Sequence, residues 1–414
     1  MSSPTSFETA LPQQYFQKGL GLKAVAQEQL ARHYHSRLVE YLRTHEFNLR
    51  VGSLHFFLAK EFGFCYGVDR AVEYAYQARE KFPERRIFLT GEIIHNPHVN
   101  HRMLEMGIGF LSGQYSKDMS FEKLRAEDVV ILPAFGVTTE ELRRLQQIGC
   151  ILVDTTCGSV LNVWKRVEQY AREGFTSVIH GKYSHEETRA TSSQATKYDN
   201  GHYLIVRDME ETESVCQYIA GKFSTEDFLA HFKKALSPNF DPRLHLQKIG
   251  VANHTTMLSS ESLAIAERLK QAMREKYGEA QLSQYFHNFD TICSATQDRQ
   301  DAVLDLVKSQ PLDLMLVIGG YNSSNTNHLV ELATIYTRAY HIDDASCLES
   351  TVQLRHKPIG QSAELVARDW LPTSTVRIGL TAGASTPNNK VGETLERIAQ
   401  LRGYNVEDWL LPQS

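Results

Sequence analysis

The chain has 414 residues, of which 42% are hydrophobic and 22% are charged, and its formal net charge is -5 at pH 7. This balance is typical of a folded globular protein and excludes an intrinsically disordered chain. The negative charge and the lack of basic clusters also argue against a general nucleic-acid-binding surface. Because single hydrophobic cores rarely grow beyond roughly 300 residues, we expect two or three domains.

The amino-terminal stretch M-S-S-P-T-S-F-E-T-A lacks the charged and apolar regions of a signal peptide and the arginine bias of a transit peptide. No apolar stretch in the chain approaches the ~20 residues that are needed to cross a bilayer. We therefore expect no membrane span and a cytoplasmic location, with the plastid stroma as the alternative for a eukaryotic source.

Residues 1–50 combine a polar lead with a helical pattern, and they are expected to form an N-terminal extension. From there on one unit recurs, in which a short run rich in Val, Ile and Leu is followed by a polar loop and an amphipathic helix. This alternation predicts an α/β fold with mainly parallel sheets. We expect three α/β domains over residues 51–157, 158–290 and 291–414, the last including a C-terminal tail, with the Cys65 segment packing centrally.

Lone cysteines follow three of the predicted strands, and each stands directly before a helical pattern: Cys65, Cys157 and Cys293. In open α/β sheets, ligands collect at the carboxyl ends of the strands, so these loops are where we expect chemistry. Free N–H groups and the dipole at a helix start favour negative charge, so these thiols are expected to ionise easily. The remaining cysteines lack this setting and are predicted to be structural: Cys150, Cys216 and Cys347.

The wide spacing of the three cysteines allows each to belong to a different α/β unit, so that they meet at a junction of domains. Structural zinc sites usually draw ligands from a close pair such as C-x-x-C, which is missing here, so the zinc interpretation is weak. Three thiolates without a fourth suit an iron-sulfur cluster with one iron left open for substrate. Three separately buried thiols remain the alternative.

Two histidine-containing loops offer groups that bind anions. The stretch I-I-H-N-P-H-V-N-H places His95 at a strand end, whereas His98 and His101 beyond it suit a solvated helix face. The stretch H-E-E-T places His185 and Glu187 in another strand-end loop. These two residues could bind an anion and carry a proton, or they could simply cap a helix.

Two further loops are dense in hydroxyl and amide groups: Ser323, Ser324 and Asn325 in N-S-S-N-T-N, and Ser385 in T-A-G-A-S-T-P. Helix starts bind phosphate readily through their free N–H groups, and small polar side chains add donors. The repetition favours a divided phosphate or diphosphate site over two ordinary helix caps. Neither G-x-x-x-x-G-K-[ST] nor a strand-placed G-x-G-x-x-G occurs, so a nucleotide-type loop is not expected.

Together with H-N-P, N-H-T-T-M-L and T-I-C-S-A-T-Q-D-R-Q-D-A, these motifs resemble the hydroxymethylbutenyl diphosphate reductases of the LytB/IspH family. The likeness runs from about residue 50 to 405 and is closest to the cyanobacterial and plastid branch. The resemblance implies three α/β domains arranged as a pseudo-threefold trefoil around a central 4Fe-4S cluster. Cys65, Cys157 and Cys293 would hold one such cluster per subunit and leave one iron open.

The resemblance also implies a two-electron reductive dehydroxylation of hydroxymethylbutenyl diphosphate to isopentenyl and dimethylallyl diphosphates, the last step of the non-mevalonate isoprenoid pathway. Glu187 would deliver the proton, with Thr255 near the substrate hydroxyl. A ferredoxin or flavodoxin would donate the electrons, and no nucleic acid is involved. The diphosphate would be bound by a wider set of residues: His95, His185, Thr255, Ser323, Ser324, Asn325 and Ser385.

The sequence departs from the family pattern at three positions. Phe135 stands where many bacterial members have histidine, Gly158 where proline is usual, and His254 where glutamine is usual. The departures concern one diphosphate contact, one helix start and the proton network. Two other functions stay open: a zinc-dependent phosphate-ester hydrolase built on His95, His185 and a carboxylate, and a non-catalytic phosphate-ligand binding protein.

Overall fold

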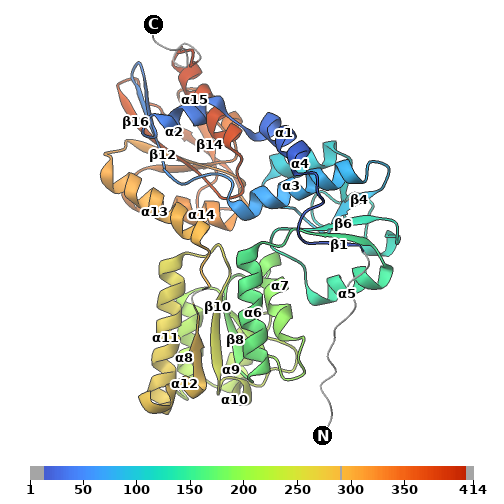
Figure 1. The fold of residues 1–414 in the computed structure, drawn as a ribbon. Coiled ribbons are helices and arrows are strands. Elements are labelled where there is room, and N and C mark those ends of the chain that lie inside the picture. The colour runs from blue at the N-terminus through green and yellow to red at the C-terminus, as the bar shows by residue number, and fades with distance from the viewer. Residues whose placement is uncertain (1–13, 290, 407–414) are drawn as a thin grey trace.

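The computed structural model describes residues 14–289 and 291–406, which form three lobes with one main sheet each (Figure 1). The first sheet contains, in spatial order, β1 Tyr15–Phe16, β7 Ile151–Asp154, β6 Val129–Leu132, β4 Ile87–Leu89 and β5 Ile108–Phe110. The second contains β11 Phe286–Asn288, β10 Ile249–Asn253, β8 Thr176–His180 and β9 Tyr203–Val206. The third contains β13 Ala339–Ile342, β12 Leu314–Ile318, β16 Val376–Ala382, β3 Leu54–Leu58 and β2 Asn48–Val51.

Helices cover both faces of every main sheet, so each lobe is a three-layer sandwich. The first sheet lies between α1 Lys23–Tyr34, α3 Tyr66–Lys81 and α4 Pro97–Glu105 on one face and α5 Thr139–Ile148 on the other. The second lies between α6 Gly158–Arg172 with α7 Glu186–Ala195 and α8 Met209–Ile219 with α11 Ser259–Tyr277. The third lies between α13 Ser294–Ser309 with α14 Ser324–Tyr336 and α2 Arg37–Thr44 with α15 Asn388–Leu401.

Shorter elements complete the described chain. A separate antiparallel hairpin joins β14 Gln353–His356 to β15 Leu365–Arg368. The short helices are α9 Thr225–His231, α10 Pro242–His245 and α12 Leu282–Tyr285, with 3-10 turns at Phe121–Lys123, Glu279–Gln281 and Ala345–Cys347. Every strand pair within the three main sheets is parallel apart from β2 with β3. The predicted α/β class with mainly parallel sheets is confirmed.

Local sequence signals account for these elements. The strands V-V-I-L of β6 and L-M-L-V-I of β12 are buried along their whole length, because helices cover both faces of a parallel sheet. Helix α5 begins with a capping box between Thr138 and Glu141 and ends at Gly149, whose φ of 84° suits glycine. Helix α4 begins with an Asn96 cap and Pro97 in its first turn.

Three of the points at which the chain passes from one lobe to another carry one candidate cysteine each. Strand β3 of the third sheet leads through Cys65 into α3 of the first lobe. Strand β7 leads through Cys157 into α6 of the second lobe, and β11 is followed by Cys293 and α13 of the third lobe. Because each crossover follows the carboxyl end of a strand, the three cysteines meet where the lobes join.

The segment before residue 50 is built into the lobes and differs from the expected appended extension. Strand β1 pairs with β7, α1 packs on α3, and α2 enters the core of the third lobe. Strand β3 pairs with β16 near the other end of the chain, so the expected boundary at residue 51 cuts through the third sheet. Strand partners are set by distant residues, which local patterns do not reveal. The rest of the expected extension and of the C-terminal tail lies outside the described residues.

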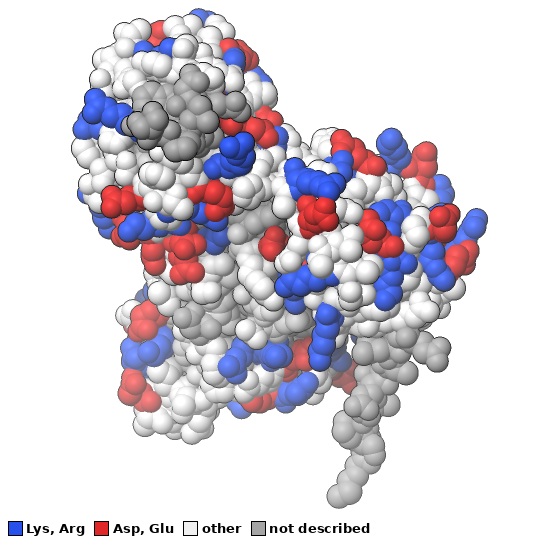
Figure 2. All heavy atoms as spheres, turned by 45° about the horizontal axis from the view of Figure 1, so that its top comes forward, with Lys and Arg blue, Asp and Glu red and all other residues white. Residues whose placement is uncertain are grey.

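The surface carries both charge signs. Figure 2 shows Lys and Arg interspersed with Asp and Glu over the visible face, so its described side chains form no broad patch of one sign. Nucleic-acid-binding domains typically show a basic patch or stripe, which this face does not have. Among the helices of the described chain, none combines the length and the apolar content that a membrane span requires.

We expect Leu42→Ala in α2 to lower the free energy of unfolding by about 2 to 5 kcal/mol, because this fully buried side chain belongs to the core of the third lobe. Urea denaturation followed by circular dichroism measures the change. Leu263→Ala, at a position of α11 that is 54% exposed, is the control and should change stability by less than ~0.5 kcal/mol. Equally small effects would mean that α2 does not stabilise the core.

Candidate active site

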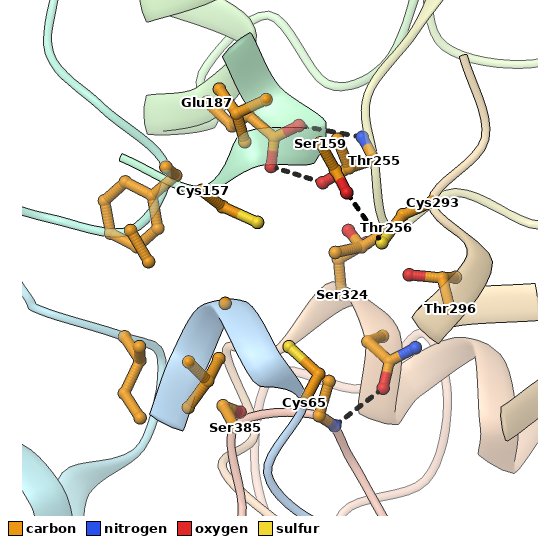
Figure 3. A pocket seen from close by; sticks show the side chains of 18 of the residues that line it. Cys65, Cys157, Ser159, Glu187, Thr255, Thr256, Cys293, Thr296, Ser324 and Ser385 are labelled. Atoms are coloured by element: carbon orange, nitrogen blue, oxygen red, sulfur yellow. Dashed lines mark hydrogen bonds between the residues drawn. The ribbon is translucent and has the colours of Figure 1, made fainter. Parts of the chain in front are cut away.

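One cavity at the junction of the lobes collects every residue that the sequence predicted for the site (Figure 3). Its lining includes Cys65, His95, Cys157, His185, Glu187, Thr255, Cys293, Ser323, Ser324, Asn325 and Ser385. These residues follow strands of all three main sheets, and most of them stand at or next to a helix start. The predicted grouping is therefore present in space, whereas the role of each residue stays a prediction.

The three cysteines direct their sulfur atoms into this cavity (Figure 3). Cys65, Cys157 and Cys293 occupy the extended N-cap positions of α3, α6 and α13. The sulfurs of Cys157 and Cys65 lie 2.5 Å and 4.0 Å from the point that a Cβ would occupy at Gly67. The Cys293 thiol donates a hydrogen bond to Ser159 Oγ over 3.4 Å. Glycine at position 67 thus leaves open a space that any side chain would fill beside two sulfurs.

The expectation that these thiols ionise easily is wrong for Cys65 and Cys157. Burial raises the pKa of both thiols, and the backbone N–H groups of Val68 and Ser159 offset only part of that rise. The neighbouring sulfurs add to the rise, because a second negative charge would face the first. Desolvation therefore outweighs the helix start. Metal coordination deprotonates a thiol outright, so this donor set fits a metal centre better than free thiolates.

A buried arginine fixes the first of the three cysteine segments against the third. Arg299 of α13 is 4% exposed and donates three hydrogen bonds of 2.8 to 3.1 Å to the carbonyl oxygens of Gly63 and Phe64. A fourth hydrogen bond, to the carbonyl oxygen of Ala295, holds the guanidinium against its own helix. Sequence analysis did not identify this residue, although a charged side chain six positions after Cys293 on a half-buried helix was an available signal.

A second arginine fixes the first cysteine segment against the second. Arg70 of α3 donates hydrogen bonds to the carbonyl oxygens of Thr155 and Thr156, which directly precede Cys157. The same side chain lies over the ring of Tyr74 at 5.4 Å. Arg70 was also missed, and it stands five positions after Cys65 in the stretch C-Y-G-V-D-R. Each arginine joins the helix that follows one cysteine to the loop that precedes another, so the two side chains help to set the distances between the cysteine loops.

Glu187 lies in the first turn of α7 and is buried against the cavity. Thr255 holds both of its oxygens, because the backbone N–H donates to Oε1 at 2.8 Å and the hydroxyl donates to Oε2 at 2.9 Å. The Nε2 atom of His254 lies 3.0 Å from Oε2. Burial raises the pKa of Glu187, but attraction to His254 and the hydrogen bonds outweigh it and leave that pKa below its usual value.

Neutral hydrogen-bond donors face the cavity from the neighbouring wall. His185 caps α7 by accepting the backbone N–H of Glu187 on Nδ1 at 3.2 Å. Burial and repulsion from His254 and His95 hold the pKa of His185 well below its usual value, so the neutral ring carries its proton on Nε2. This Nε2 and the Nδ2 of Asn325 have no hydrogen-bond partner among the described residues. Buried donors without partners mark a place for acceptor oxygens of a ligand.

The serine loops are joined to each other and to the His95 loop. The Ser385 hydroxyl donates to the carbonyl oxygen of His95 at 3.2 Å, and the Ser323 hydroxyl caps α14. The Oδ1 atom of Asn325 accepts the backbone N–H of Ala384 at 2.8 Å. The starts of α4, α7 and α14 therefore converge on one wall, and helix starts of this kind favour anions.

The three departures from the family pattern have different surroundings. The ring of Phe135 stacks on His95 at 4.9 Å with an interplanar angle of 11°, so packing orients this imidazole. The ring of His254 contacts His185 at 4.3 Å. Gly158 begins α6, and no atom lies within 4 Å of the place its Cβ would take, so a close approach does not explain this glycine.

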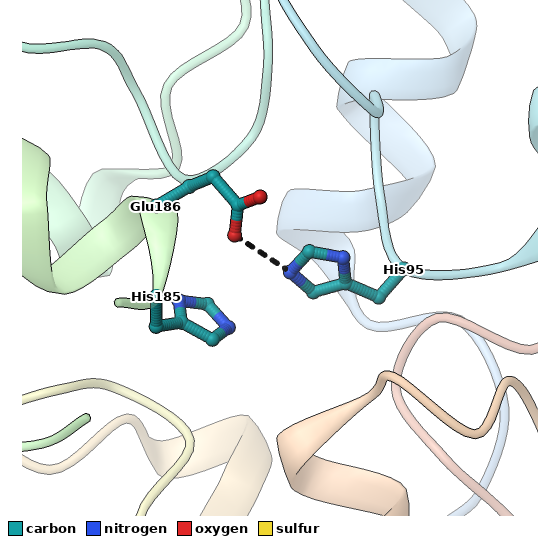
Figure 4. A group of neighbouring side chains, drawn as sticks. All are labelled: His95, His185 and Glu186. Carbon is teal, nitrogen blue, oxygen red and sulfur yellow. Dashed lines mark ion pairs between the residues drawn. The ribbon is translucent and has the colours of Figure 1, made fainter. Parts of the chain in front are cut away.

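His95, His185 and Glu186 form a compact group beside the cavity (Figure 4). Their nearest ligand atoms lie within 4.8 Å of one another, a separation at which three groups could share a cation. The Nε2 atom of His95 lies 3.7 Å from Oε2 of Glu186, whose side chain is 52% exposed. Both imidazoles belong to the anion-binding wall, and we assign no metal to this group.

The residues predicted to be structural are buried away from the cavity. Cys150, Cys216 and Cys347 lie in the cores of the first, second and third lobes, which confirms that prediction.

His98, expected on a solvated helix face, is instead half-buried, and its Nε2 lies 3.1 Å from Oδ2 of Asp344. This ion pair joins the first and third lobes beside the site.

The fold and the cavity define an α/β protein of three lobes whose crossovers bring three thiols and an anion-binding wall together. A family model described as LytB protein matches residues 56–399. The 4-hydroxy-3-methylbut-2-enyl diphosphate reductase of Gloeobacter violaceus is 46% identical over 395 residues, which cover 94% of this chain and 93% of that protein. The corresponding protein of Thermosynechococcus vestitus is 47% identical over 389 residues, which cover 94% and 95%. The chain belongs to the LytB family, as its motifs predicted.

Two solved structures are similar to this one. A structure of (E)-4-hydroxy-3-methyl-but-2-enyl diphosphate reductase, described as the terminal enzyme of the non-mevalonate pathway, is 26% identical and has a TM-score of 0.50 over 83% of this chain and 99% of that one. The E-1-hydroxy-2-methyl-but-2-enyl-4-diphosphate reductase from Plasmodium falciparum is 21% identical, with a TM-score of 0.61 over 83% and 87%. The second likeness concerns the fold alone.

We expect Arg299→Met to lower the free energy of unfolding by more than about 3 kcal/mol, because the loop before Cys65 loses three hydrogen bonds from a charged donor, each worth roughly 1.5 to 3 kcal/mol. Urea denaturation measures the loss. Arg32→Met is the control, since this arginine is 70% exposed and pairs only with Glu28, also an exposed residue of α1. An effect no larger than that of the control would remove Arg299 from its structural role.

Proposed function

We propose that the chain is a 4-hydroxy-3-methylbut-2-enyl diphosphate reductase of the last step of the non-mevalonate isoprenoid pathway. Two electrons and two protons remove the allylic hydroxyl as water and leave isopentenyl and dimethylallyl diphosphates. The observation that carries this proposal is the convergence of three thiols, one buried carboxyl group and an anion-binding wall on one cavity. Membership of the LytB family supports it.

Cys65, Cys157 and Cys293 hold one 4Fe-4S cluster per chain in this proposal, and one iron stays open to the substrate. The donor set supports the assignment, because three sulfurs face one space, Gly67 keeps that space clear, and the described lining contains no fourth cysteine. When bound, such a cluster supplies electrons and a Lewis-acidic iron that weakens the carbon-oxygen bond.

The diphosphate binds along the wall of neutral donors. The free Nε2–H of His185 and the free amide of Asn325 donate to its oxygens, and the starts of α7 and α14 add backbone N–H groups. The hydroxyl and imidazole groups that complete this wall are His95, Thr255, Ser323, Ser324 and Ser385. Binding the remote diphosphate in this way fixes the reacting end beside the thiols and lowers the entropic part of the barrier.

Glu187 delivers a proton to the substrate, and Thr255 holds Glu187 in place near the substrate hydroxyl. Of the two protons that the reaction consumes, one completes the leaving water and the other forms a new carbon-hydrogen bond. The two hydrogen bonds from Thr255 fix both carboxylate oxygens, so the carboxyl group approaches the substrate in one orientation. A positioned acid of this kind typically accelerates a reaction by about 10² to 10⁴ fold.

The two alternative functions, a zinc-dependent hydrolase and a non-catalytic binding protein, would not explain all the residues that line the cavity. A zinc-dependent phosphate-ester hydrolase would use His95, His185 and Glu186 but none of the three converging thiols. A non-catalytic phosphate-ligand binding protein would need neither the thiols nor a buried carboxyl group. We propose a ferredoxin or a flavodoxin as the electron donor, in the cytoplasm where the sequence leads us to expect the chain.

We expect Cys157→Ser to lose the visible absorption of the cluster and most of the four irons per chain while the fold is retained, because an alcohol is a poor ligand for this centre. Anaerobic absorption spectra with iron and sulfide analysis measure the loss. Cys150→Ser is the matched control, since this thiol is buried in the first lobe away from the cavity and should keep the full iron content. Wild-type iron content in Cys157→Ser would contradict the proposed ligand set.

We expect Glu187→Gln to retain the cluster and substrate binding but to lower turnover by about 10² to 10⁴ fold, because glutamine cannot deliver a proton. Reduction of the substrate by a chemical electron donor gives kcat and KM separately. Glu186→Gln, one position earlier and half-exposed, is the control and should keep turnover within about tenfold of the wild type. Near-normal turnover of Glu187→Gln would exclude Glu187 as the acid.

A further inference from the structure

His254 is a buried titratable residue to which the proposed function gives no role. The residue is 3% exposed and directly follows strand β10. The Nε2 atom lies 3.0 Å from Oε2 of Glu187, and the Nδ1 atom lies 3.5 Å from the Thr256 hydroxyl. The ring also contacts His185 at 4.3 Å. Glu187 is therefore enclosed by hydrogen bonds from Thr255 on one side and by an imidazole on the other.

The neighbours of His254 determine where a proton can reside. Glu187 and His185 face it from α7, and His180 faces it from β8. Burial lowers the pKa of His180 to about 4 and that of His185 well below its usual value, so both rings are neutral near pH 7. Among the described side chains that face His254, the Glu187 carboxylate is thus the one that compensates a positive charge on this imidazole.

The hydrogen bonds around Glu187 favour the same arrangement. Thr255 donates both its backbone N–H and its hydroxyl to the carboxylate, which stabilises the ionised form of the acid. A buried carboxylate beside a neutral imidazole would lack a countercharge, and uncompensated buried charges are costly. A proton on the imidazole removes this cost, whereas a proton on the carboxyl group would forfeit the charge-assisted hydrogen bonds from Thr255.

We propose that His254 is the residue that stores the proton for Glu187: it keeps the carboxylate ionised and oriented between turnovers and then passes its proton to the acid. In that transfer the Nε2–H bond of the imidazolium breaks and the Oε2–H bond of Glu187 forms. The imidazole is left neutral and takes up its next proton from solvent. The transfer to substrate rests on the proposed function, whereas the charged pair between His254 and Glu187 does not.

The test is the pH dependence of turnover in His254→Gln, because glutamine can donate a hydrogen bond but cannot carry the proton. In the wild type, the proton can reside on the imidazole, whose Nε2 lies 3.0 Å from the carboxylate oxygen that compensates its charge. In the variant, the proton must reside on Glu187 itself and is lost at lower pH. We expect the alkaline limb of kcat to move to lower pH by about one unit or more, with KM within about twofold.

The matched control is His202→Gln in the same lobe. His202 lies at the opposite end of β9 from the site, where it stacks on His245 and contacts the Ser237 hydroxyl at 3.1 Å. Its pH profile should coincide with that of the wild type. An unchanged alkaline limb in His254→Gln would overturn the proposal, since a purely structural histidine can be replaced without moving a titration.

A second measurement leaves His254 in place and needs no substrate. In the holoenzyme with 13Cε1-labelled histidine, we expect one imidazole signal to titrate about one unit or more lower in Glu187→Gln than in the wild type, because the imidazolium loses its countercharge. Identical histidine titrations in the two proteins would reject the pair. This measurement does not depend on the reaction. A wild type that is inactive on the diphosphate would reject the proposed function, whereas the spectra alone would still decide whether His254 and Glu187 form a charged pair.

Discussion

The site depends on one constraint, which is that three chain crossovers from three sheets must meet at a single point. Each crossover carries a cysteine at a helix start, so the distance between sulfurs is the distance between lobes. Arg299 and Arg70 help to set this distance by donating to the backbone carbonyls that precede Cys65 and Cys157. The positions of the cysteines therefore depend on hydrogen bonds to the backbone of their own loops.

Burial is the main influence on the pKa values of the groups in the cavity, and it shifts the pKa of thiols and of imidazoles in opposite directions. It raises the pKa of Cys65 and Cys157 and lowers that of His185, so these groups are neutral unless a ligand supplies charge. Glu187 is the exception, because His254 and the Thr255 hydrogen bonds outweigh its desolvation. The cavity thus presents neutral hydrogen-bond donors along its wall and an ionised carboxylate at Glu187.

Local sequence patterns correctly predicted the features that depend only on residues close together in the chain. Buried strand runs and helix starts are local, so the α/β class and the positions of the three cysteines before helices could be read directly. The pairing of β3 with β16 could not, because the partner strand lies at the other end of the chain. The acidity of Cys65 and Cys157 was predicted with the wrong sign, since a helix start is visible in sequence and the depth of burial is not. Arg299 was missed for the same reason.

The imidazole rings of the cavity wall form one continuous row of contacts that ends at Glu187. Phe135 stacks on His95, His95 meets His185 edge to face at 5.0 Å, and His185 touches His254 beside Glu187. Two of the three departures from the family pattern stand at the two ends of this row of rings. In the proposed function, this row runs from the imidazoles assigned to the diphosphate to the imidazole that faces Glu187. Because close-packed interiors transmit strain, the proposed substrate binding and the proposed proton delivery would be coupled through these rings.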